Sequence, residues 1–75
     1  MTVISVKAVP GGWAVQDGSA AAPLVFLRGG EAERKAHQLG AQWAEVCGEA
    51  EVRIHDRSGA LVGRSLYFAS QAVVA

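Results

Sequence analysis

The sequence predicts an α+β domain of two layers, an antiparallel sheet of about five strands with one helix on one face. Segments rich in β-branched and alternating residues lie before and after a single segment of helical periodicity, and glycine-containing turns separate them. The chain has 75 residues, of which 51% are hydrophobic, enough for one small core. The expected order is strand, strand, strand, helix, strand, strand, all within a single domain spanning residues 1–75.

Three strands are expected before the helix. Residues 2–9 alternate loosely and contain many β-branched side chains, and Pro10-Gly11-Gly12 ends this run as a hairpin turn. Residues 13–16 form a second strand with Trp13 facing the core. Residues 24–27 are a short, continuous apolar run, typical of a strand covered on both faces.

The helix is predicted from apolar residues that recur four and three positions apart and therefore share one face: Ala32, Ala36, Leu39, Trp43 and Val46. Gly48 suits the left-handed position that ends a helix. Gly40, in the middle of the helix, costs about 1 kcal/mol relative to alanine. We therefore expect a close approach of the helix to the sheet at Gly40.

Two further strands follow the helix. Residues 52–55 alternate between apolar and polar, residues 56–59 form a turn with Gly59 at positive φ, and residues 60–64 form the fifth strand. The predicted core lies between helix and sheet and comprises Ile4, Val6, Trp13, Val15, Phe26, Ala32, Ala36, Leu39, Trp43, Val46, Val52, Ile54 and Leu61.

Composition excludes several classes of function. Seven basic and seven acidic side chains cancel, which gives no general attraction to nucleic acid or lipid. One cysteine and two histidines make neither a disulfide nor a closed zinc site, so no metal or cofactor is expected. No apolar run reaches the roughly 18 residues of a membrane span, and no basic-then-apolar leader opens the chain. A cytoplasmic protein that does not bind membranes is expected.

Catalysis is not expected from the residue pattern. His55 and Asp56 are neighbours, but adjacent strand residues point to opposite faces and do not readily meet. Cys47 and His37 lie ten residues apart on the helix, about 15 Å along its axis. Neither pair forms a nucleophile with its base, and the chain is predicted not to be an enzyme.

The succession of motifs resembles a known family. The residues that carry it are Trp13 and Val15, Phe26, Glu31-Ala32 with Ala36 and Leu39, then Val52-Arg53-Ile54-His55-Asp56 with Ser58-Gly59, and Tyr67. Over residues 6–67 this order resembles domain-of-unknown-function family 2188, small bacterial proteins. The family's usual Thr-Lys before the helix is replaced by Arg28-Gly29-Gly30. The resemblance implies this fold and a bacterial origin, with no cofactor and no catalytic residue.

Apolar surface beyond the needs of one core predicts a non-enzymatic interaction domain that forms a homodimer. One helix covers a single face of the sheet, yet both faces receive apolar residues, and residues 66–75 form an apolar tail. The alternative is that this tail folds back over the open face of its own sheet. The predicted self-association residues are Val25, Leu27, Leu66, Tyr67, Phe68, Val73 and Val74.

A second hypothesis is weak binding of nucleic acid by the C-terminal hairpin. Arg53, His55, Arg57 and Arg64 could give that hairpin a basic face. A nucleic-acid-binding domain usually has a larger charge excess and exposed aromatic side chains, so this function is the less favoured of the two.

Overall fold

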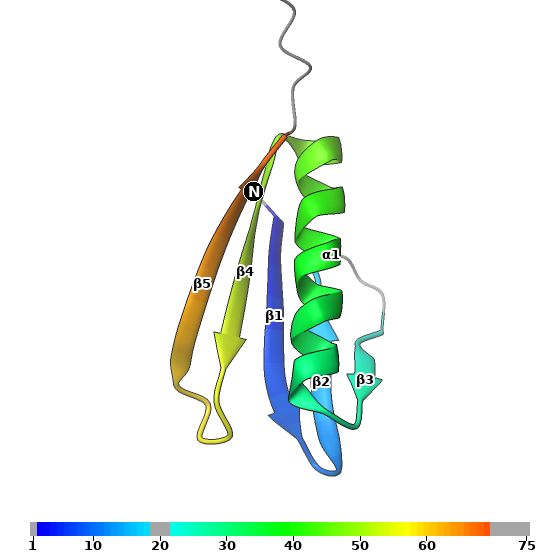
Figure 1. Cartoon of the computed structure of the whole chain (residues 1–75), viewed down its shortest axis with the longest axis vertical. Helices are drawn as coiled ribbons and strands as arrows, with labels where there is room; N and C mark the ends of the chain where they lie inside the picture. The colour runs from blue at the N-terminus through cyan, green and yellow to red at the C-terminus, as the bar shows by residue number, and fades with distance from the viewer. Residues whose placement is uncertain (1, 19–21, 70–75) are drawn as a thin grey trace, which may run out of the picture.

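The computed structural model describes residues 2–18 and 22–69, and shows one helix packed on one face of a five-stranded sheet (Figure 1). The order of elements predicted from the sequence is confirmed. The elements are β1 Thr2–Val9, β2 Gly12–Gln16, β3 Leu24–Phe26, α1 Gly29–Cys47, β4 Glu49–His55 and β5 Leu61–Phe68.

The sheet has the strand order β3-β2-β1-β4-β5 and is mixed rather than wholly antiparallel. Three neighbouring pairs are antiparallel, whereas β1 and β4 are parallel, with Ile4 beside Val52. The parallel pair arises because α1 carries the chain back across the sheet, so that β4 begins at the same end as β1. The crossover places β4 between β1 and β5 and leaves β5 at one edge.

The core lies between α1 and the central strands. Ile4, Val6, Val15 and Val52 are fully buried there, with Trp13, Phe26, Leu39, Trp43, Ile54 and Tyr67 packed around them. The helix presents a row of small residues to the sheet: Ala32, Ala36, Gly40 and Ala44. A Cβ atom at Gly40 would lie 2.8 Å from Val52 Cγ2 and 2.9 Å from Tyr67 Cδ2, which confirms the predicted close approach.

Two predicted core residues are exposed. Val46 is 76% exposed because it lies two positions, or about 200° of helical rotation, from the buried Ala44. Leu61 is 48% exposed because it pairs with His55. His55 is two positions after Arg53 and, like Arg53, lies on the sheet face away from the helix. The prediction that these two side chains are buried is therefore wrong.

Strand β5 is longer than the sequence predicted. It continues to Phe68 because the ladder with β4 runs without a break from Ile54–Gly63 to Glu49–Phe68. Leu66, Tyr67 and Phe68 are thus strand residues rather than part of a tail. Residues 70–75, including Val73 and Val74, lie outside the described residues. Within residues 2–18 and 22–69, no helix is long and apolar enough to cross a membrane.

Candidate interaction surface

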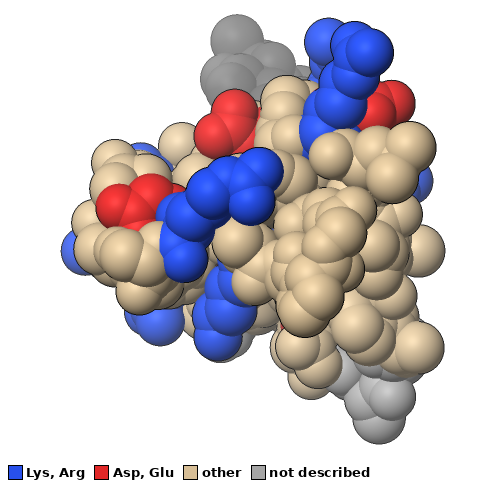
Figure 2. Space-filling view, turned by 90° about the horizontal axis from the view of Figure 1, so that it is seen from below, with Lys and Arg blue, Asp and Glu red and all other residues tan. Residues whose placement is uncertain are grey.

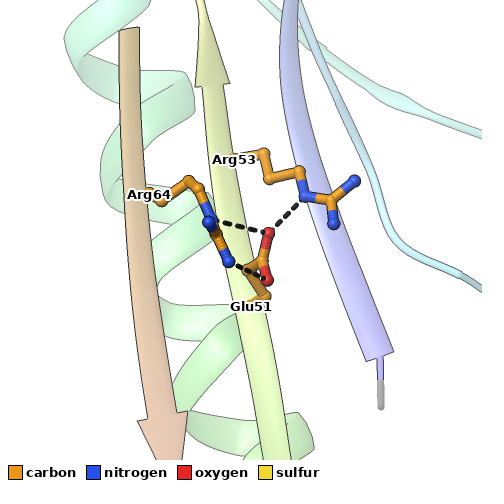
Figure 3. A network of polar contacts seen from close by, with 3 residues as sticks. All are labelled: Glu51, Arg53 and Arg64. Atoms are coloured by element: carbon orange, nitrogen blue, oxygen red, sulfur yellow. Dashed lines mark hydrogen bonds and ion pairs between the residues drawn. The ribbon is translucent and has the colours of Figure 1, made fainter. Parts of the chain in front are cut away.

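The face of the sheet opposite the helix, here called the open face, contains a buried acid. Val52 points to the helix, so its strand neighbour Glu51 points to the open face, which no helix covers. Glu51 is nevertheless only 1% exposed. Arg53 Nε donates to Glu51 Oε2, and Arg64 donates from Nε to Oε2 at 3.2 Å and from Nη2 to Oε1 at 3.0 Å (Figure 3). The two long arginine side chains lie over the carboxylate and shield it from water.

This network links β4 to the edge strand. Arg53 and Arg64 are directly opposite each other in the β4–β5 ladder, where two like charges alone would repel. Glu51 lies between them and compensates one of the two charges. Hydrogen bonds from Arg53 and Arg64 lower the pKa of Glu51, so the carboxylate stays ionised despite its burial.

Strand β5 has backbone groups that no strand of the described chain pairs. The Ala69 N–H donates to the Gly48 carbonyl at 3.0 Å, which makes Gly48–Ala69 a hydrogen-bonded pair of the antiparallel ladder. Such pairs alternate with pairs whose N–H and C=O groups point away from the partner strand. Arg64, Leu66 and Phe68 therefore direct their N–H and C=O groups outward, along the free side of the sheet.

Apolar side chains follow the same edge. Leu66 is 52% exposed and Phe68 is 65% exposed, both on the open face, and Leu61 and Val62 are exposed at the start of the strand. An edge strand with exposed apolar side chains is a template for pairing with another chain. We call residues 61–68, with their outward backbone groups, the β5 edge.

The predicted self-association residues do not form one surface. Leu66 and Phe68 lie on the β5 edge, whereas Val25 and Leu27 lie at or beside β3, the opposite edge of the sheet. Tyr67 faces the helix, where its hydroxyl lies 2.5 Å from His37 Nδ1. Tyr67 therefore belongs to the packing between helix and sheet.

The four residues of the nucleic-acid hypothesis all lie on β4, β5 or the turn between them, and each has a contact within the chain. Arg53 and Arg64 bind Glu51, and Arg57 Cζ lies 5.2 Å from the centre of the Trp13 ring. His55 Nδ1 lies 3.1 Å from the Val6 carbonyl oxygen. Figure 2, a view of the end with the β1–β2 and β4–β5 turns, shows basic side chains spread among uncharged and acidic ones.

A surface cavity of about 330 Å³ lies beside the β4–β5 turn, lined in part by Lys7, His55 and Asp56. Asp56 Oδ1 accepts hydrogen bonds from the Ser58 N–H, the Ser58 hydroxyl and the Ala60 N–H, at 2.6 to 3.0 Å. These bonds hold the turn and lower the pKa of Asp56, with the Ser58 side chain as the main cause. This carboxylate is therefore part of the turn rather than a base aimed at a ligand.

Sequence reasoning missed Glu51 and the outward groups of β5. The sequence places Glu49, Glu51 and Arg53 at alternate positions, which indicates a shared face and is a signal for an ion pair. Among the described residues, no group of three or more His, Cys, Asp or Glu side chains is arranged to hold a metal ion.

No known protein family, curated protein or solved structure matches this chain. The resemblance to family 2188 therefore stays a prediction, and the arguments for function rest on the geometry of the sheet.

Proposed function

We propose that this chain is a non-enzymatic interaction domain that forms a two-fold homodimer through the β5 edge. The observation that carries the proposal is an eight-residue edge strand whose outward backbone groups coincide with exposed Leu66 and Phe68. Pairing with a second chain would satisfy the backbone groups and cover the apolar side chains together.

The other edge of the sheet supports pairing less well. Strand β3 has three residues, Leu24–Phe26, and short edge strands are a usual protection against edge-to-edge association. A contact of β3 with β5 would also be head-to-tail and would lead to open chains of subunits unless the rotation closed a ring. Pairing of β5 with β5 closes after two subunits.

Light scattering on the full-length chain at low micromolar concentration tests the proposal. We expect the mass of a dimer, and we expect the Leu66→Ser/Phe68→Ser variant to be monomeric. The matched control is Val25→Ser/Leu27→Ser, which removes two exposed apolar side chains at the other edge and should remain dimeric. A monomeric parent protein, or a dimer lost only in the control, would refute the proposal.

Truncation separates the β5 edge from the residues beyond it. A chain that ends after Ala69 retains all of β5 and should remain dimeric. Conversion of this shortened chain to a monomer would place the interface in residues 70–75 instead.

Nucleic-acid binding is the alternative function. One observation favours it: Lys7, Arg53 and Arg64 occur at open-face positions of three adjacent strands. Against it, one charge of the arginine pair is already compensated by Glu51. A mobility-shift assay with mixed DNA and RNA at low salt tests this function, because phosphate contacts weaken steeply with salt. No shift at micromolar protein would exclude it.

A further inference from the structure

We infer that the two copies pair antiparallel along β5, with the two-fold axis at Ser65, to give one continuous sheet across the dimer. This inference rests on the proposed homodimer and adds the partner strand, its direction and its register.

The direction follows from the symmetry of the edge. Two identical strands related by a two-fold axis perpendicular to the sheet are antiparallel. A residue that precedes the axis by a number of positions in one copy then pairs with the residue that follows the axis by the same number in the other copy. With the axis at Ser65, Arg64 pairs with Leu66 of the second copy and Val62 pairs with Phe68 of the second copy. Arg64, Leu66 and Phe68 point their backbone groups outward, so these pairs are of the hydrogen-bonded type.

Two observations favour the axis at Ser65 over its neighbours. An axis at Arg64 would put two guanidinium groups directly opposite each other, which is destabilising. An axis at Leu66 would pair only residues 64–68 of β5 with their equivalents, whereas the axis at Ser65 pairs residues 62–68. The register at Ser65 therefore gives a longer ladder than the axis at Leu66 and, unlike the axis at Arg64, does not put like charges directly opposite each other.

This register also fixes where the charges of the open face lie. Leu66 lies opposite Glu51 within one copy, so Arg64 of the second copy falls in the same row, one strand beyond Leu66. Two strand spacings separate the backbones of Glu51 and that arginine by about 10 Å. The two Arg64 residues then lie diagonally across the axis, and each is compensated by the Glu51 of its own copy.

The register can be tested by disulfide cross-linking. Ser65 pairs with buried Val52 and so lies on the helix side of the sheet. At the axis, the two Ser65 residues form a non-hydrogen-bonded pair with Cα atoms about 4.5 Å apart. That separation is within the range that a disulfide spans.

The experiment uses full-length chains with Cys47→Ser, because Cys47 is an exposed thiol that could cross-link by itself. Ser65→Cys in this background should form a covalent dimer with oxidised glutathione, which accepts the two electrons and two protons that the thiols lose. Leu66→Cys tests the neighbouring register and is compared at a concentration where light scattering shows the reduced variant to be a dimer. Ser58→Cys, in the exposed β4–β5 turn, reports random collision. We expect at least a tenfold higher initial rate of cross-linking for Ser65→Cys than for either control.

Faster cross-linking of Leu66→Cys, or equal rates for all three variants, would overturn the register. Light scattering on the reduced variants keeps the two proposals distinguishable. A reduced dimer that fails to cross-link at Ser65 contradicts the register alone, whereas a reduced monomer for the Cys47→Ser chain contradicts the homodimer as well.

Discussion

Arg64 donates a 3.0 Å hydrogen bond from Nη2 to Oε1 of Glu51, and this bond ties the edge strand β5 to its neighbour β4. The acceptor is a carboxylate buried on the face that has no helix, where water would otherwise solvate it. The positions of both arginines on the open face thus depend on one acid.

Replacement of Glu51 by Gln should lower the free energy of unfolding. The change removes the negative charge between Arg53 and Arg64, which are opposite each other, and leaves their repulsion uncompensated. Glu49→Gln, an exposed acid two positions earlier on the same strand, is the matched control and should have little effect. Urea unfolding at pH 7 measures both, and equal midpoints for the two variants would contradict this role of Glu51.

Acid should destabilise the fold through Glu51 and Asp56. Hydrogen bonds from Arg53 and Arg64 lower the pKa of Glu51 in the folded chain. Hydrogen bonds from Ser58 and the neighbouring turn lower the pKa of Asp56. A carboxyl with a lowered folded pKa stabilises the fold above its unfolded pKa, which is about 4, and the stabilisation is lost as pH falls through the folded value. The free energy of unfolding should therefore decrease below about pH 4.

The Glu51→Gln/Asp56→Asn variant gives the control for acid. It should be less stable than the parent at pH 7, and its stability should change less between pH 5 and pH 3. Urea midpoints across this range measure the difference, and an equal loss in both proteins would assign the acid sensitivity to other groups.

Gly40→Ala should destabilise the domain although alanine is the better helix former by about 1 kcal/mol. The added methyl group would lie within 3 Å of Val52 and Tyr67, and overpacking of this kind costs about 1–3 kcal/mol. Gly30→Ala, at the start of α1 with no atom within 4 Å of the new methyl group, should be neutral or slightly stabilising. Thermal unfolding measures both, and a Gly40→Ala chain more stable than the parent would contradict the packing of α1.

Local chemistry predicted much of the fold. Turn and cap glycines were found from sequence because their positions require backbone conformations that other residues rarely adopt. Gly11, Gly48 and Gly59 have φ values of 81°, 94° and 89°. The spacing of Ala32 and Ala36 predicted the buried face of the helix, because helical periodicity is also a local property of the sequence.

The remaining features depend on contacts between distant parts of the chain. Nothing local in residues 2–9 specifies that β1 pairs with β4, and this pairing made the sheet mixed. The burial of Glu51 depends on Arg64, thirteen residues away on another strand. The end of β5 was predicted too early because the run Leu66-Tyr67-Phe68 is apolar throughout and has no alternation to mark a strand with two different faces.

Amide hydrogen exchange in β5 tests the central claim most directly. The N–H groups of Ser65 and Tyr67 point to β4 and should be protected at every protein concentration, whereas those of Arg64 and Leu66 point outward. In the paired dimer, Arg64 and Leu66 should become protected as the concentration rises through the dissociation constant. The contrary result is that the amides of Arg64 and Leu66 exchange at the rate of an open strand at all concentrations while Ser65 and Tyr67 stay protected. This result would contradict pairing through β5.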